Sequence, residues 1–216
     1  MDEANFFQFN ELLTLDDKKV IAELDSPYKI FQFLDDVKYY SGEHNRSIIN
    51  VLHDRQAHCL DGGLFAATML YKLGYPAVII DLLPEPGTDE DHILAIYQQN
   101  NLWGCVAKSN FTGLRYRDPI YSSLRDLVLS FLEVYFNREG FKTLRSYTRP
   151  IRLKYFNHLN WLVDDYAVDE MENHIKSVKS TPLLSKEMIS SLSRVDKRTY
   201  DAGIMKAGLD WEYKVQ

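Results

Sequence analysis

Apolar residues near the start of the chain recur at the three- and four-residue spacing of amphipathic helices. This spacing predicts a short helix over residues 16–24 and a second helix that opens at Ser26 and Pro27. Serine is a preferred helix cap, and proline fits the first turn because the N–H that it lacks would have no partner there. A third short helix is predicted after Ser47, over apolar residues with the same spacing.

The longest apolar segment follows Cys59 and predicts a helix at the centre of the fold. Between Leu60 and Leu73, apolar residues cover most of the helical surface, which is typical of a buried helix. Gly74 suits the left-handed residue that often ends a helix, and Pro76 prevents the helix from continuing.

The pattern then changes to that of strands. A mostly apolar run over residues 77–83 predicts a buried strand, and residues 84–91 read as an acidic, turn-rich loop. Residues 92–98 and 102–108 predict the two strands of a hairpin, joined by a turn at residues 99–101.

The remainder of the chain is predicted to be mostly helical. Asp118 and Pro119 have the order of an N-cap and a first helical residue, so they predict the start of a helix. Residues 151–179 are expected to be helical, and residues 182–216 are expected to form short helices that close the chain.

Length and charge limit the class of protein. A chain of 216 residues suits one domain with an appendage, and we expect a core domain over residues 1–147 and a helical extension over residues 148–216, packed on the core. The formal net charge is −6 and the isoelectric point is near 5.5. This balance argues against nucleic acid as the main partner, because nucleic-acid-binding proteins carry a basic stripe.

Cysteine content and the absence of long apolar segments indicate the compartment. Cys59 and Cys105 are the two cysteines, too few for a disulfide framework. The first residues lack a basic region followed by an apolar run, and no segment reaches the ~18 apolar residues that span a bilayer. We therefore expect a reduced, cytoplasmic protein that contacts no membrane.

Cys59 and His92 are the candidate chemical groups. Cys59 lies at the start of the predicted central helix, and His92 opens a predicted strand 33 residues later (92 − 59). A helix N-terminus and a nearby imidazolium both favour the thiolate, which is the nucleophilic form of cysteine. The pair therefore suggests nucleophilic catalysis by a thiol.

The predicted hairpin suggests a third member of this group. If Gln98 lies opposite Leu102, then His92 faces Lys108 across the ladder and Asn110 is its diagonal neighbour on the same face. Diagonal neighbours lie roughly 7–8 Å apart, within reach of a side-chain hydrogen bond. Asn110 could then orient the imidazole, while the Lys108 ammonium would disfavour the imidazolium.

Other residues remain candidates for this third position. A change of one residue in the turn would favour Ser109 or Ala107 instead of Asn110. Asp118 is an acidic candidate, although its place before Pro119 favours helix capping. Asp61, in the first turn of the central helix, is read as structural because its charge would oppose formation of a thiolate.

Several motifs within roughly residues 26–110 form a recognisable set. They are Arg46-Ser47, Val51-Leu52, His58-Cys59-Leu60-Asp61, Ala66-Ala67, Met69-Leu70, Leu73-Gly74-Tyr75-Pro76-Ala77, His92 and Trp103-Gly104-Cys105-Val106. Together they resemble the transglutaminase-like superfamily, the papain-like group that includes bacterial cysteine-peptidase-like proteins.

This resemblance implies an α+β fold in which the helix that carries Cys59 packs on a small antiparallel sheet, with extra helices at both ends. It implies Cys59 as nucleophile and His92 as general base and acid. The family usually has an aspartate a few positions after the tryptophan of the second strand, where this chain has Ala107. Asn110 is then the candidate third residue.

The implied activity is a cysteine-dependent hydrolase or acyltransferase that acts on a peptide or small amide through a thioester. No cofactor or metal is expected. Gln56, His58 and Trp103 are candidates for oxyanion or substrate binding, together with the backbone N–H of Cys59.

Alternative functions remain open because the aspartate is missing. The chain could be an inactive binding module of the same fold for a protein or peptide partner. It could also be a thiol redox sensor that uses Cys59 and Cys105. A metal site built from His53, His58, Cys59 and His92 is disfavoured, since their spacing matches no familiar zinc pattern.

Overall fold

An antiparallel sheet forms the middle of the protein in the computed structural model, which describes residues 1–40, 42 and 44–204. Within this part of the chain the sheet has seven strands in the order β6-β5-β4-β3-β7-β9, and β8 also pairs with β3. The strands are β3 (Val78–Pro84), β4 (His92–Gln99), β5 (Leu102–Val106), β6 (Tyr116–Tyr121), β7 (Leu144–Thr148), β8 (Ile151–Arg152) and β9 (Ser180–Pro182).

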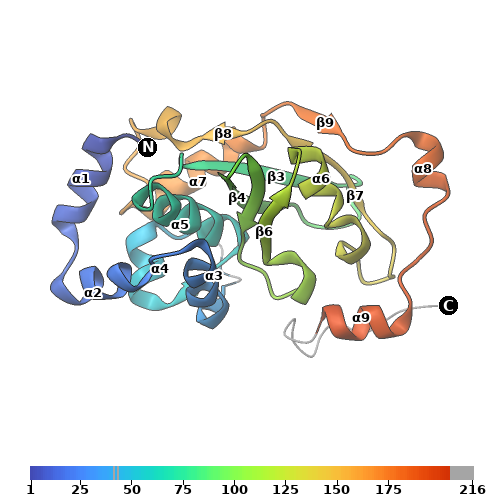
Figure 1. Cartoon of the computed structure of the whole chain (residues 1–216), viewed down its shortest axis with the longest axis horizontal. Helices are drawn as coiled ribbons and strands as arrows, with labels where there is room; N and C mark the ends of the chain where they lie inside the picture. Colours follow the sequence, from blue (N-terminus) through green and yellow to red (C-terminus); the bar gives the residue numbers. More distant parts are fainter. Residues whose placement is uncertain (41, 43, 205–216) are drawn as a thin grey trace.

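Helices lie on both faces of the sheet and at its two ends. They are α1 (Glu3–Leu12), α2 (Leu15–Glu23), α3 (Pro27–Asp36), α4 (Ile48–Asp54), α5 (Cys59–Lys72), α6 (Leu124–Leu129), α7 (Asp165–Ile175), α8 (Lys186–Ser190) and α9 (Lys197–Gly203), with short 3₁₀ turns η1 (Thr112–Leu114), η2 (Leu132–Val134) and η3 (Leu153–Phe156). In Figure 1, α1 and α2 lie at one end of the molecule and α8 and α9 at the other. A small parallel pair, β1 (Lys38–Tyr39) and β2 (Gln56–Ala57), precedes α5.

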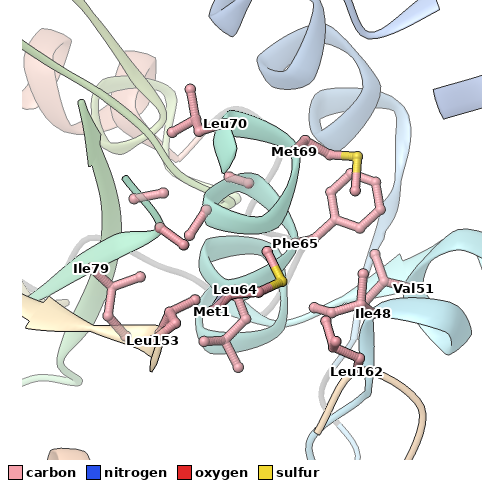
Figure 2. Close-up of a cluster of buried hydrophobic side chains, with 14 of the residues drawn as sticks. Met1, Ile48, Val51, Leu64, Phe65, Met69, Leu70, Ile79, Leu153 and Leu162 are labelled. Atoms are coloured by element: carbon pink, nitrogen blue, oxygen red, sulfur yellow. The ribbon is translucent and has the colours of Figure 1, made fainter. Parts of the chain in front are cut away.

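Helix α5 is the centre of the main hydrophobic core, as its apolar pattern predicts. Every residue from Cys59 to Leu70 is buried. Figure 2 shows Phe65 and Met69 on one side of the helix, toward Val51, and Ile79 and Leu153 on the other side. Gly74 adopts φ +90° immediately after the helix, a conformation that favours glycine.

Two consecutive glycines allow α5 to approach its neighbours closely. A Cβ on Gly62 would collide with the Cβ of Lys108, and a Cβ on Gly63 would collide with the side chain of Ile93 on β4. The start of α5 therefore contacts the start of β4 and the segment after β5 at backbone distance. This contact brings the two predicted reactive residues to the same end of the sheet.

The opposite face of the sheet has its own core. Ile80, Leu94 and Cys105 project from the strands into a cluster that Leu127 and Phe131 close from α6 and the residue after its C-cap. Alternate strand residues thus pack against α5 on one face and α6 on the other, which explains the nearly continuous apolar runs. The mixed architecture agrees with the expected α+β papain-like fold.

The C-terminal part joins the main sheet. β8 pairs with β3, and β9 pairs with β7. The expectation that residues 151–179 are wholly helical is therefore wrong: a strand and a 3₁₀ turn come first, and α7 begins at Asp165. Residues 205–216 of the predicted helical extension lie outside the described part of the chain.

Helix α7 also packs on the first part of the chain. Val168 and Met171 are fully buried in the core that surrounds α5. The Asp165 carboxylate accepts the Ser47 amide at 2.6 Å, and this bond connects α7 to the start of α4.

Two sequence predictions in the sheet require correction. The turn of the β4–β5 hairpin has two residues, Asn100 and Asn101, both with positive φ, so Gln98 lies opposite Trp103 instead of Leu102. Asp118 and Pro119 lie within β6 and do not start a helix. Proline is tolerated there because β6 is an edge strand.

Candidate active site

Cys59 is the first residue of α5, and its position is set by local hydrogen bonds. His58 is the N-cap residue of the helix. The buried Asp61 carboxylate accepts the amides of His58 at 2.8 Å and of Arg46 at 2.9 Å. Asp61 therefore fixes the backbone that leads into the helix, in agreement with its structural reading.

A cavity of about 550 Å³ opens beside Cys59. Its lining includes Cys59, His92, Ser109 and Asn110, which come from three segments of the chain. These residues are brought together because α5 and β4 begin at the same end of the sheet and the segment after β5 passes Gly62. The size is typical of pockets that accept a small molecule or a few residues of a peptide.

The Cys59 thiol is almost fully buried, with 5% of the residue exposed. Burial first, and then the negative charge of Asp91, raise the pKa of the Cys59 thiol well above its usual value, while the backbone N–H of Ile93 acts in the opposite direction. The sulfur also lies 4.0 Å from the carbonyl oxygen of Asp91. The thiol is therefore protonated at neutral pH.

His92 is held in one tautomer by the backbone. Its Nε2 lies 2.7 Å from the carbonyl oxygen of Leu114. A carbonyl only accepts hydrogen bonds, so Nε2 carries the hydrogen and Nδ1 of the neutral ring is the basic nitrogen. Burial lowers the pKa of His92 to about 4 despite this hydrogen bond, so the ring is neutral at pH 7.

The Leu114 carbonyl occupies the orienting position that the sequence suggested for Asn110. The observed hairpin register, in which paired residue numbers sum to 201, also differs from the register that placed Lys108 opposite His92. Asn110 lines the cavity and is partly exposed. Ser109 lies beside it, and its hydroxyl accepts the amide of Phe111 at 3.0 Å.

Lys108 points away from His92. Its ammonium donates to the carbonyl of Leu34 at 2.8 Å and to the carbonyl of Val37, at the C-terminal end of α3. Carbonyls in the last turn of a helix lack intrahelical partners, and a cation there is favourable. Lys108 thus connects α3 to the segment after β5, and the expected repulsion between Lys108 and the histidine does not occur.

The other predicted site residues are distributed differently. His58 contacts the Cys59 sulfur, with Nδ1 at 3.6 Å and Nε2 at 3.8 Å. Gln56 and Trp103 do not line the cavity, and Trp103 packs against the core on the far face of the sheet. Asp118 is exposed on β6 and accepts a hydrogen bond from the Tyr116 hydroxyl.

Part of the cavity wall comes from residues that sequence reasoning did not single out. Asp89, Glu90 and Asp91 line it from the loop before β4, and Tyr135 and Arg138 line it from the segment after η2. The Tyr135 hydroxyl donates to the carbonyl of Glu90 at 2.5 Å and so holds that loop. The acidic loop was visible in the sequence, whereas nothing in the local pattern marked Tyr135.

Further features bear on the alternative functions. Among the described residues, no three metal-binding side chains are grouped to hold an ion. Both cysteines are free thiols; Cys105 packs on the face of the sheet opposite α5, so the sheet separates it from Cys59. None of the described helices has the length and apolarity needed to cross a bilayer.

Comparison with known proteins yields distant structural likenesses. No protein-family model matches the chain, and no curated protein matches it. Among solved structures, Legionella pneumophila LapG aligns at 14% identity with a TM-score of 0.33, over 48% of this chain and 70% of that chain. The EGTA-treated form of LapG aligns with the same identity and TM-score, over 68% of that chain.

Proposed function

We propose that the protein is a cysteine-dependent hydrolase or acyltransferase that acts on the acyl group of a peptide or small amide. Cys59 is the nucleophile and His92 is the general base and acid. The observation that supports this most strongly is that a thiol at a helix start and an imidazole of fixed tautomer open into the same cavity.

The protonation states favour a particular order of events. Burial raises the thiol pKa of Cys59 and lowers the imidazole pKa of His92 to about 4, so the resting pair is uncharged. The proton therefore leaves the sulfur as the bond to the substrate forms, and it passes to Nδ1 of His92. The imidazolium that results keeps its Nε2–H bond to the Leu114 carbonyl.

The reaction then follows the usual course of acyl transfer. The sulfur bonds to the carbonyl carbon and negative charge develops on the carbonyl oxygen, where the N–H of Cys59 and the side chain of Asn110 are available as donors. His92 returns the proton to the departing nitrogen as the carbon–nitrogen bond breaks. Water or an amine then attacks the thioester while His92 takes its proton. The carbon–sulfur bond breaks to release the acyl product, and the proton passes from His92 to the sulfur, which restores the thiol.

The test is hydrolysis of a small activated ester, p-nitrophenyl acetate, combined with alkylation of the thiol by iodoacetamide. We expect Cys59→Ala to abolish ester turnover. His92→Gln keeps a donor for the Leu114 carbonyl but removes the base, and we expect kcat/KM to fall by about 10²–10⁴-fold.

Two matched variants serve as controls. Cys105→Ala removes the other buried thiol and should leave turnover intact. His158→Gln removes an exposed histidine outside the cavity and should do the same. Turnover that survives Cys59→Ala, or a His92→Gln variant as active as His158→Gln, would show that this assignment is wrong.

A further inference from the structure

Asp81 places a carboxyl group in the hydrophobic interior of the sheet. It lies in the middle of β3 between Ile80 and Leu82, and only 1% of the residue is exposed. Its partner across the ladder is Ile93, which packs on Gly63 of α5, so the Asp81 side chain projects toward the α5 face. An isolated carboxylate in such a place is very unfavourable, so its surroundings must compensate for its burial.

The surroundings of Asp81 do not supply an ordinary counterion. Neither oxygen has a hydrogen bond of normal geometry with the described residues. The groups that perturb it are, after burial, the carboxyl of Asp91 and the amide of His92. Lys176 is the cation that acts on Asp81, but its side chain is 56% exposed and its ammonium pairs with Glu172 at 2.6 Å.

Asp91 directly precedes His92, which pairs with Leu82 beside Asp81, and its carboxyl group contacts that of Asp81. Two neighbouring carboxyl groups disfavour each other's ionisation, and burial makes this effect strongest at Asp81. Burial, reinforced by Asp91, raises the pKa of Asp81 to about 8. At pH 7 Asp81 is therefore the protonated partner and has one O–H to donate. Asp91, which lines the cavity, is the carboxylate that can accept it.

The pair is directly connected to the reactive sulfur. The carbonyl of Asp91 lies 4.0 Å from the Cys59 sulfur, and the N–H of Ile93 faces the same sulfur. Asp91 and Ile93 flank His92, so this short segment carries both the imidazole and the backbone groups that touch the thiol. Its position depends on what holds the Asp91 side chain.

We propose that Asp81 and Asp91 form a carboxylic acid–carboxylate pair that shares one proton beneath Cys59 and positions the Asp91–Ile93 backbone against the sulfur. Asp81 is thus a positioning residue for the proposed acyl transfer, and this inference rests on that function. The pair holds the Asp91–Ile93 backbone in place as long as the shared proton is bound.

Loss of the proton adds a second negative charge next to the thiol. The charged or titratable groups around Asp81 are Asp91 before β4, Cys59 at the start of α5, Tyr135 after η2 and Lys176 at the end of α7. Asp91 and Asp81 both oppose ionisation of Cys59. The site should therefore lose activity as Asp81 ionises.

The first test is the pH profile of kcat/KM for p-nitrophenyl acetate in the full chain, corrected for spontaneous hydrolysis. In the wild type we expect the rate constant at pH 9 to be about a tenth of that at pH 7, because about a tenth of a group with pKa about 8 is protonated there. Asp81→Asn keeps a neutral donor to Asp91, so this decrease should disappear. Asp81→Ala has no donor, and its kcat/KM should fall at least about tenfold at pH 7.

Asp118→Asn is the matched control, since Asp118 is an exposed aspartate on a strand of the same sheet. It should keep the alkaline decrease. An Asp81→Asn variant with the same profile as Asp118→Asn would overturn the inference while leaving Cys59 as nucleophile. Activity that survives Cys59→Ala would overturn the proposed function itself.

A direct measurement on the wild-type protein covers the case in which the variants fold poorly. Carboxyl ¹³C resonances of aspartate can be followed by NMR from pH 4 to pH 10. We expect one resonance to titrate near pH 8, and expect it to be absent in Asp81→Asn. If all aspartates titrate below pH 6, no proton is shared and the inference is wrong.

Discussion

Asp81→Asn is expected to make the protein more stable at pH 8, although it removes a buried native side chain. The reason is proton linkage. The folded-state pKa of Asp81 is about 8 and its ordinary value is 3.8. Between these two values the folded protein binds a proton that the unfolded chain releases, so the free energy of unfolding falls as pH rises. Above about pH 8 both states are ionised and the loss is complete.

The magnitude follows from the same two values. Each tenfold change in proton affinity corresponds to about 1.4 kcal/mol, so the full interval sets a ceiling of ~6 kcal/mol. Most of the interval lies between pH 5 and pH 8, where the ceiling is ~4 kcal/mol. Structural relaxation and entry of water around a buried charge reduce the actual change in unfolding free energy below this ceiling. We therefore expect the advantage of Asp81→Asn over the wild type to grow by ~2–4 kcal/mol from pH 5 to pH 8.

Urea unfolding at each pH measures this difference, with fluorescence of the buried Trp161 as one probe and circular dichroism as another. Asp118→Asn again serves as the control, since it changes the same charge on an exposed strand position. The reasoning is refuted if the free-energy curves of Asp81→Asn and the wild type run parallel from pH 5 to pH 8.

Three further substitutions test separate parts of the account. The wild type should lose unfolding free energy as pH falls from about 6.5 through 4, because only the unfolded chain protonates the buried His92 in that window. This loss should be absent in His92→Gln, and urea unfolding at pH 4.5 and 7 checks it. Lys108→Met should cost ~2–4 kcal/mol in unfolding free energy at pH 7, since it leaves the carbonyls at the end of α3 unsatisfied; a cost below ~0.5 kcal/mol would refute the contact. Gly62→Ala should cost ~1–3 kcal/mol through its collision with Lys108, and an unchanged melting temperature would show that the close approach is absent.

The fold was predictable where the signal is local. The helix from Cys59 to Lys72 follows from a continuous apolar surface and from Gly74, whose φ of +90° ends it. The β4–β5 hairpin follows from apolar residues around two asparagines. Its register was one residue off because Asn100 and Asn101 alone form the turn, and a one-residue change in turn length alters every pairing.

Other elements depend on tertiary context and were misjudged. Asp118-Pro119 has the sequence of a helix start, but these residues lie in an edge strand, where proline costs little. β9 has no buried residue and a proline at its end, so it carries no apolar signal, and pairing with β7 alone defines it.

The candidate site shows the same division. The positions of Cys59 at a helix start and His92 at a strand start could be predicted from the sequence, because both are local features. The partner of His92 is the backbone carbonyl of Leu114. Every residue has such a carbonyl, so the sequence could not identify this partner. The sequence pattern placed Asp81 in a buried strand without singling it out, because its proposed role depends on Asp91 and on burial, which are set by the tertiary structure.

The most direct test of the central claim is to look for the thioester itself. Turnover of p-nitrophenyl acetate can be quenched in acid within milliseconds and the protein digested and analysed by mass spectrometry. The account predicts one acetyl group on the peptide that contains Cys59, formed in the wild type and in Cys105→Ala, and strongly reduced in His92→Gln. An acetyl group on Cys105 or another residue during turnover, with Cys59 left free, would contradict it.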